Sequence, residues 1–213
     1  SVDSICIFNG SDAIGPEAPM VFGKEEGLNA GGVVYSKFAG NTYEDLILTK
    51  INETWLISGT TPQDYKKFKV SDDGCVAPGT FKSCNTGYEI SPGLFKHVLI
   101  WQSDSAINLF DGNAIMPISG DISNYFDRTT SECINSSMIH KSESFFDERN
   151  LEYHWLLASG AATSLDTELV YDLMKKKWYQ IDRGTGSYLQ MGFSVRDTYG
   201  NAYNYGSIDT GYI

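Results

Sequence analysis

An aspartate followed six residues later by an aromatic residue recurs at even spacing in the second half of the chain. The three copies lie in "SFFDERNLEYHWLL" (144–157), "LVYDLMKKKWYQI" (169–181) and "FSVRDTYGNAYNYG" (193–206). The pairs are Asp147 with Tyr153, Asp172 with Trp178, and Asp197 with Tyr203, and successive aspartates are 25 residues apart. A repeat of fixed length constrains the fold strongly, because every copy must form the same supersecondary unit.

Each copy predicts a β-hairpin. A strand-like apolar run leads to the aspartate, whose side chain can accept hydrogen bonds from backbone N–H groups of a turn. Four or five polar residues reverse the chain, and the aromatic residue then opens an alternating return strand. The template also fits "LILTKINETWLISG" (46–59), with Thr49 in the place of the aspartate and Trp55 as the aromatic residue.

Three adjacent lysines at 175–177 fall in the reversal of the second copy. The equivalent residues of the other copies are Arg149 and Asn150, and Gly200 and Asn201, so positive charge does not belong to the position. We therefore interpret the lysines as a solvated hairpin tip. The formal net charge of −11 also argues against non-specific binding to nucleic acid or anionic membranes. We expect neither sequence-specific nucleic-acid binding nor a membrane partner.

A second similarity covers a longer distance along the chain. The segment "ICIFNGSDAIGP" (5–16) resembles "INLFDGNAIMP" (107–117). Each has a strand-like run and then Asn-Gly or Asp-Gly, the dipeptides that best fit the type I′ turn of a two-residue hairpin loop. The glycines of the two dipeptides, Gly10 and Gly112, are 102 residues apart, close to four 25-residue units.

The repeat length points to a fold class. Two hairpins of about 25 residues make a four-stranded meander of about 50, the size of one β-propeller blade. We predict an all-β, propeller-like array of four-stranded antiparallel meander blades, about four to six of them, in a complete or partial ring. It would form a single domain over 1–213, and its strand-like end at "SIDTGYI" favours a fragment of a longer chain. A β-sandwich is the alternative.

Two kinds of segment interrupt the strands. The region 71–96 is rich in Gly, Pro, Ser and Asn and predicts a long connection between blades, or a loop on one face. Helix is expected only as short turns, in "TPQDYKKFK" (61–69) and "ISNYFDR" (122–128). No apolar run approaches the length of about 18 residues that a membrane helix requires.

Residues for metal or cofactor chemistry are few and scattered. The four cysteines have no C-x-x-C spacing, and nothing indicates that they converge with His97, His140 and His154 on a zinc ion. Cys75 and Cys84 either close a short loop as a disulfide or remain free thiols in a reducing cytosol. We interpret His154, in "LEYHWLL", as a strand residue. We expect no metal and no cofactor.

Motifs for catalysis are also missing from the sequence. It contains no nucleophile elbow, phosphate-binding loop, dinucleotide fingerprint or calcium loop. The four tryptophans lie in or beside alternating strands, where core packing is more common than a carbohydrate platform. We therefore expect no catalytic and no cofactor-binding residue.

Several of these segments together resemble a known group of proteins. They are "HVLIWQSDSAINLFDGNAIMPISGDISNYFD" (97–127), "FFDERNLEYHWLL" (145–157) and "ELVYDLMKKKWYQIDRG" (168–184). The pattern has a strand that ends in Phe-Asp-Gly, then an Asp-x-x-Asn hairpin leading to Tyr-x-Trp, and then a Tyr-Asp turn that leads to Trp. It is similar to the β-propeller-like structural proteins of tailed bacteriophages, which form neck, hub or nozzle parts of the tail. The resemblance covers 97–213 well, whereas the first 96 residues share only its general character.

The resemblance implies a function without catalysis. The chain would be a structural component of the virion, assembled in the host cytoplasm, with other tail or neck proteins or further copies of itself as partners. The alternative is a carbohydrate-binding or sialidase-like propeller. Sialidases carry S-x-D-x-G-x-x-W boxes and an arginine cluster. The nearest segment, "SDDGCVAPGTF" (71–81), lacks the tryptophan, and the chain has four arginines, of which Arg149 lies in a predicted turn and Arg196 beside one.

Overall fold

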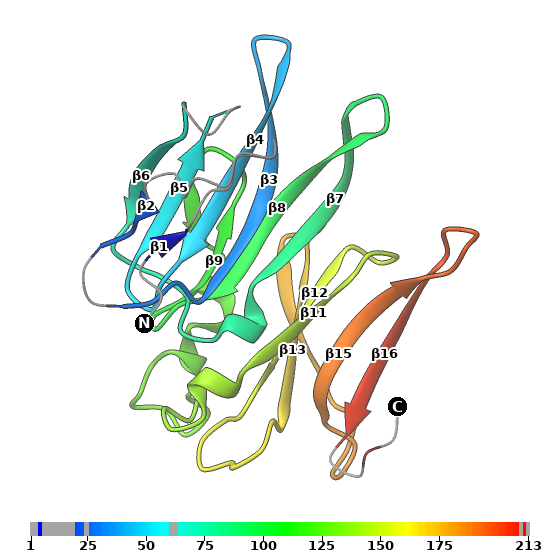
Figure 1. Ribbon diagram of the computed structural model, residues 1–213. Helices are drawn as coiled ribbons and strands as arrows, with labels where there is room; N and C mark the ends of the chain where they lie inside the picture. Colours follow the sequence, from blue (N-terminus) through cyan, green and yellow to red (C-terminus); the bar gives the residue numbers. More distant parts are fainter. Residues whose placement is uncertain (1–3, 6–19, 24–25, 60–63, 209–210, 212–213) are drawn as a thin grey trace.

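The computed structural model describes residues 4–5, 20–23, 26–59, 64–208 and 211, and this part of the chain is almost entirely strand and turn (Figure 1). Its helical segments are three short 3₁₀ turns, η1 (Pro78–Thr80), η2 (Gly120–Tyr125) and η3 (Ile139–Lys141). None of them is long enough to cross a membrane, and no other helix occurs among the described residues.

Three four-stranded antiparallel meanders follow one another along the chain. The first sheet contains β3 (Ala30–Phe38), β4 (Asn41–Thr49), β5 (Thr54–Ser58) and β6 (Lys66–Ser71). The second contains β7 (Lys82–Ser91), β8 (Leu94–Gln102), β9 (Ile107–Phe110) and β10 (Ile115–Pro117). The third contains β11 (Glu143–Asp147), β12 (Glu152–Leu157), β13 (Thr167–Asp172) and β14 (Lys177–Ile181).

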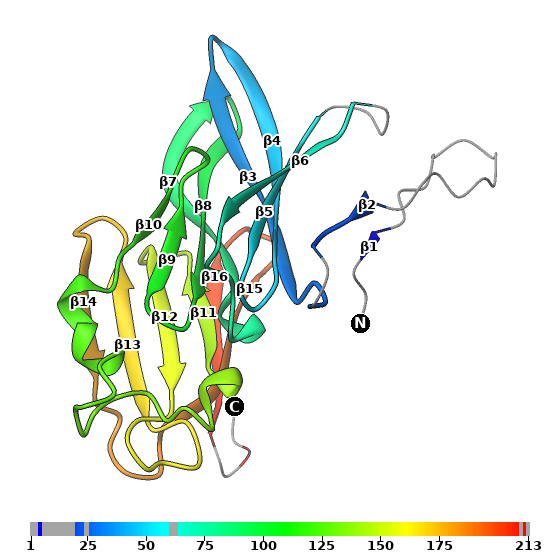
Figure 2. The ribbon, with the colours of Figure 1, turned by 90° about the vertical axis from the view of Figure 1, so that its left-hand side faces the viewer.

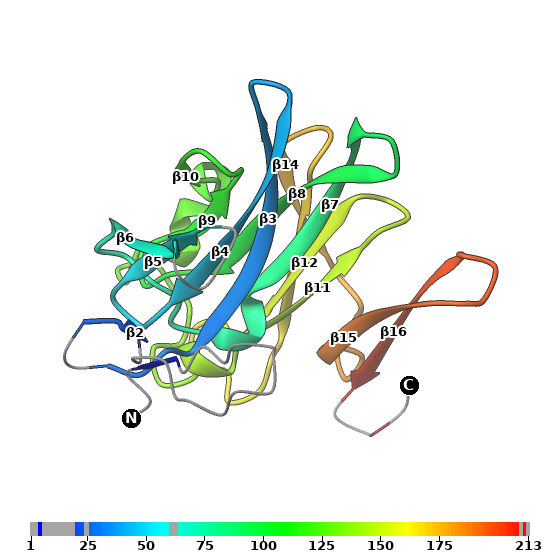
Figure 3. The same ribbon diagram turned by 45° about the horizontal axis from the view of Figure 1, so that its top comes forward.

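Two smaller sheets complete the described structure. The C-terminal hairpin consists of β15 (Leu189–Arg196) and β16 (Ala202–Ile208), and a short pair consists of β1 (Ser4–Ile5) and β2 (Met20–Val21). The first strand of each sheet lies next to the following sheet: β3 contacts β7 and β8, β7 contacts β11, and β11 contacts β15. Figure 3 shows the sheets succeeding one another across the molecule, with the first sheet and the C-terminal hairpin at opposite ends, and Figure 2 shows the first sheet at the upper right and the third sheet at the lower left.

This arrangement confirms the predicted all-β, propeller-like array of four-stranded meander blades. The described residues contain three complete blades and one two-stranded hairpin that stack in series, whereas a β-sandwich consists of two packed sheets. The array is open, because the two ends do not meet (Figure 3).

Apolar side chains from facing sheets fill the spaces between blades. Strand alternation sends Tyr153, Trp155 and Leu157 of β12 toward the second sheet, where they meet Ile100 and other buried residues. The polar atoms of these aromatic residues also bond across the interface. The Tyr153 hydroxyl donates to the Thr80 carbonyl at 2.8 Å, and Trp155 Nε1 donates to Gln102 Oε1 at 2.9 Å.

The turn chemistry expected of the repeated aspartates is confirmed. Asp147 Oδ1 accepts the backbone N–H groups of Arg149 and Asn150, at 2.8 and 3.2 Å. Asp172 Oδ1 accepts those of residues 174 and 175, and Asp197 Oδ1 those of residues 199 and 201. The paired aromatic residue is the second residue of the return strand in each copy, so the strand begins one residue earlier than predicted.

The other hairpins agree with the sequence in part. Thr49 and Trp55 occupy the expected places in the β4–β5 hairpin, but the Thr49 hydroxyl donates to Asn29 Oδ1 and does not cap the turn. The hairpin at Asp111-Gly112 has a four-residue loop and not a two-residue type I′ turn, because Asp111 Oδ1 accepts the N–H groups of residues 113 and 114. Most of the related segment 5–16 lies outside the described residues.

Two sequence expectations about connections are wrong. Only residues 72–81 of the region 71–96 connect two blades, since residues 82–91 form β7 and β8 begins at Leu94. The sequence of β7 shows no clear alternation of apolar and polar residues, because most of this strand is half-buried or exposed. Residues 66–69 belong to β6 and not to a helical turn, whereas the expected turn within 122–128 is confirmed by η2.

Candidate functional site

The C-terminal hairpin has two chemically different faces. Its inner face lies on the third sheet. A Cβ atom added to Gly192 would lie only 2.1 Å from the ring of Phe145, so glycine permits the close approach. The Ser194 hydroxyl donates to the Phe146 carbonyl at 2.6 Å, and Gln190 Nε2 donates to the backbone of the β12–β13 loop at 2.8 Å.

The outer face of the same hairpin is apolar and exposed. It carries Met191, Phe193, Val195, Tyr203 and Tyr205, whose exposed fractions lie between 43% and 51%. Phe193 stands opposite Tyr205 in the register, and their rings stack with centroids 5.7 Å apart. Val195 stands opposite Tyr203, so the five side chains form one continuous patch, called here the outer hairpin patch. Contiguous exposed apolar surface of this kind marks interaction sites.

The edge of the hairpin is also open. In the described part of the chain β16 pairs only with β15, whereas every complete blade has four strands. A strand edge of this kind presents backbone N–H and C=O groups to any further strand.

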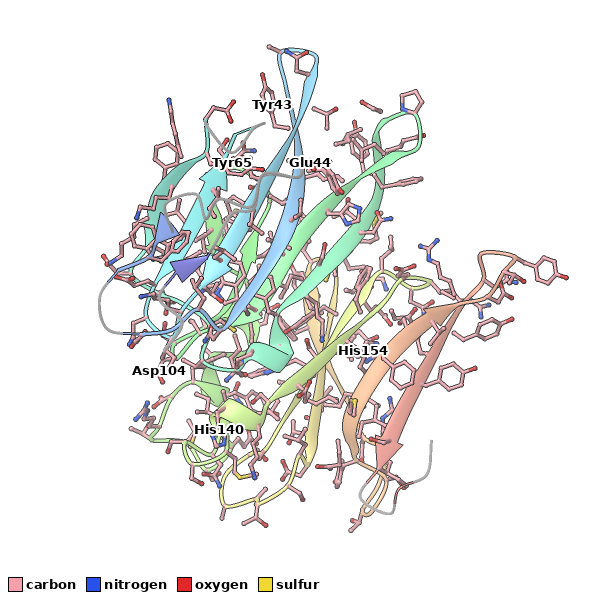
Figure 4. All side chains as sticks on the ribbon, in the orientation of Figure 1. Tyr43, Glu44, Tyr65, Asp104, His140 and His154 are labelled. Atoms are coloured by element: carbon pink, nitrogen blue, oxygen red, sulfur yellow. The ribbon has the colours of Figure 1, made fainter. Side chains whose placement is uncertain are left out.

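A buried polar cluster lies on the side of the third sheet that faces the hairpin, at His154 (Figure 4). His154 on β12 and Glu168 on β13 are 6% and 2% exposed, and His154 Nδ1 lies 2.7 Å from Glu168 Oε1. Arg183, just after β14, donates to both oxygens of the Glu168 carboxylate. Burial raises the pKa of Glu168, but the hydrogen bonds from His154 and Arg183 outweigh it and hold the pKa below its ordinary value.

Two open cavities lie near the ends of strands. One, of about 530 Å³, lies between the tips of the third sheet and the C-terminal hairpin, where Glu148 pairs with Arg196. The other, of about 600 Å³, lies between the outer strands of the first and second sheets, where Asn108 Nδ2 donates to Asp73 Oδ2 at 3.2 Å.

The histidines that the sequence left unassigned lie on separate elements. His97 is on β8 beside Tyr35, with ring centroids 5.3 Å apart, and His140 is exposed in η3 (Figure 4). His154 is a packed strand residue, as predicted, with its ring stacked on Phe145. The sequence missed its partnership with Glu168, because alternation places both residues on a face of their strand but does not give the register between the strands.

The cysteine alternatives are settled for the described residues. Cys75, Cys84 and Cys133 are free, so no disulfide joins Cys75 to Cys84. Burial raises the pKa of Cys75 to about 11, and it also raises the pKa of Cys84. Thiols held protonated in this way are poor nucleophiles and poor metal ligands.

The lysines and tryptophans occupy the places that the sequence predicts. Residues 173–176 form the loop between β13 and β14, and Lys175 Nζ lies 2.7 Å from Asp172 Oδ2, so Lys175 and Lys176 mark a hairpin tip and Lys177 begins β14. Trp101 and Trp155 are fully buried, and Trp178 is half-buried and donates to the Ile118 carbonyl at 2.7 Å. These tryptophans therefore serve in packing between blades.

Comparison with known proteins yields no relative: no family model matches the chain, and neither does any curated protein.

Proposed function

We propose that this chain is a non-enzymatic assembly component whose C-terminal hairpin docks against a β-sheet of a neighbouring subunit. The observation that carries the proposal is the outer hairpin patch beside the free edge of β16. The inner face of the same hairpin already packs on a sheet, so its outer face has the shape and chemistry to receive another. An isolated two-stranded hairpin gains stability from such packing.

The size of the patch bears on how the partner binds. A stable interface buries about 1,200–2,000 Å² in total, more than five half-exposed side chains supply. We therefore expect the partner to cover the free edge of β16 as well, adding strands to the two-stranded sheet. The new contact would continue the series of blades, with the aromatic pair Phe193 and Tyr205 as its centre.

The assembly that we propose is the tail or neck of a bacteriophage virion. Its support is the sequence resemblance at 97–127, 145–157 and 168–184, together with an architecture that offers rigid blades and, among the described residues, no helical layer. In this role the partner is another tail or neck protein. Affinity would come from buried interface area, as in other protein assemblies.

The test mixes the purified chain with the proteins encoded by its neighbouring genes and measures complex mass by size-exclusion chromatography with light scattering. Phe193→Lys should abolish the complex, since it places a charge in the centre of the apolar contact. The matched control is Phe68→Lys on β6, at the other end of the array, where the phenylalanine is 49% exposed. It should leave the complex intact.

The possible outcomes separate the parts of the proposal. Loss of the complex with Phe193→Lys alone supports docking on the outer hairpin patch. If both variants form the complex, or if both lose it, docking on the outer hairpin patch is wrong. If no virion protein binds, or if the chain associates only with itself, the proposed partner is wrong.

A further inference from the structure

His154 presents a buried ring nitrogen that makes no hydrogen bond within the described part of the chain. Its Nδ1 lies 2.7 Å from Glu168 Oε1, and Arg183 donates to both oxygens of that carboxylate. The other nitrogen, Nε2, is buried and has no hydrogen-bond partner among the described residues. A buried polar atom without a hydrogen bond is unfavourable, so this nitrogen is a candidate for binding a ligand.

Two carboxylates face this nitrogen from the same side of the third sheet. Asp147 ends β11, Glu152 begins β12 directly opposite it, and His154 follows two residues later on the same face. One ligand atom from each of the three residues lies within 4.8 Å of the others. The Nε2 atom of His154 is 3.9 Å from Glu152 Oε2.

Each of the three side chains is held in place by a further partner. Glu168 fixes the ring of His154, and the Tyr179 hydroxyl donates to Glu152 Oε1 at 2.6 Å, which leaves Glu152 Oε2 toward the histidine. Asp147 is oriented by its turn, and its Oδ2 accepts a bond from Asn150 Nδ2 at 2.8 Å. A metal-binding histidine commonly donates its other N–H to a carboxylate, and metal-binding carboxylates are themselves hydrogen-bonded.

We propose that His154 Nε2, Glu152 Oε2 and a carboxylate oxygen of Asp147 form a binding site for a divalent transition-metal ion, preferably Zn²⁺. Imidazole favours such ions over Mg²⁺ and Ca²⁺, and two carboxylates balance the charge of the ion. Ligands of a tetrahedral Zn²⁺ lie about 3.3–3.5 Å apart, so small side-chain movements bring the three groups into range. Water completes the coordination.

The position of the site suggests its effect. It lies between the β11–β12 hairpin and the C-terminal hairpin, where Asn204 of β16 interacts with Asp147 and contributes to its low pKa against the effect of burial. The open cavity at the tips of the same two hairpins is lined by Glu148 and Arg149, which directly follow Asp147. A bound ion would therefore stiffen the support of the outer hairpin patch.

The test uses the full chain, freed of metal with EDTA and titrated with ZnSO₄ in a calorimeter. We expect one ion per chain with micromolar or tighter affinity. Glu152→Gln should weaken binding at least about tenfold, while its amide oxygen can still accept the Tyr179 hydrogen bond. Glu148→Gln is the control, because it removes the same charge from a neighbouring residue outside the three ligands.

A spectroscopic measurement does not depend on the folding of variants. In the wild-type chain, Zn²⁺ should shift the ¹⁵N resonance of His154 Nε2 and leave those of His97 and His140 in place. Co²⁺ should give the visible bands of a four- or five-coordinate site. The proposal fails if Zn²⁺ does not bind below millimolar concentration, if Glu148→Gln weakens binding as much as Glu152→Gln, or if the His154 resonance does not move.

Discussion

At the scale of single residues, the hairpin tips show how one aspartate fixes a turn that other residues must then fit. Leu151 and Lys176 are the last loop residues in the first two copies, and their φ angles are +58° and +55°. A side chain disfavours this left-handed conformation, which glycine adopts freely. The third copy has a five-residue loop, 197–201, in place of four residues, and Gly200 within it has a φ of +85°.

The lysines at 175–177 allow a sharp test of this point. Lys176→Gly should raise the free energy of unfolding by about 0.5–1 kcal/mol, because the strained position is relieved. Lys177→Gly removes the same charge from the first residue of β14 and should lower it by a similar amount, about 0.5–1 kcal/mol. Urea unfolding of both variants measures these changes. If both variants changed the free energy of unfolding in the same direction, loss of the lysine charge and not backbone conformation would be the main effect.

The turn aspartates predict how stability depends on acid. The Lys175 ammonium and the turn N–H groups hold the pKa of Asp172 below its ordinary value, and Asn201 does the same for Asp197. A carboxyl whose pKa is lower in the folded state stabilises it fully above the unfolded pKa, and this contribution is lost as pH falls through the folded pKa. The melting temperature of Asp172→Asn should therefore be lower than that of the wild type at pH 6, and the two melting temperatures should be equal near pH 2. A constant difference in melting temperature across this range would contradict the assignment.

At the scale of elements, the sequence predicts what is local and misses what depends on neighbours. The Asp-to-aromatic hairpins could be predicted because both the turn bonds and the alternation lie within about 14 residues of sequence. Strand β7 was missed, since its half-exposed residues carry no clear period. The pairing of His154 with Glu168 depends on the register of β12 against β13, which local patterns do not specify.

The attachment of the C-terminal hairpin should depend on one glycine. Gly192→Ala forces its new methyl group against Phe145, and such overpacking costs about 1–3 kcal/mol. Met191→Ala, the neighbouring change on the exposed face, should alter stability by less than about 0.5 kcal/mol. Hydrogen exchange of β15 together with urea unfolding measures both. Equal effects would mean that the hairpin does not rest on Phe145.

At the scale of the whole molecule, the blades form a series in which each contacts its neighbours. Local stability in such an array depends on how many neighbours an element has. Strand β13 is buried along its whole length and has a strand on either side, whereas β15 contacts the third sheet and β16 pairs only with β15 in the described part of the chain. Stability should therefore be greatest within the array and least at the open hairpin.

Native-state hydrogen exchange can test this gradient and the proposed docking in one experiment. In the isolated chain, amides of β12 and β13 should exchange on the order of 100-fold more slowly than those of β15 and β16, because the hairpin opens without unfolding the sheets beneath it. Binding a partner on the outer hairpin patch should slow exchange in β15 and β16 and leave β5 and β6 unchanged, since those strands lie at the far end of the array. If the free hairpin is already as protected as β13, the molecule unfolds as one unit. The hairpin would then already be stable without a neighbouring strand, and binding a partner would add little to its local stability.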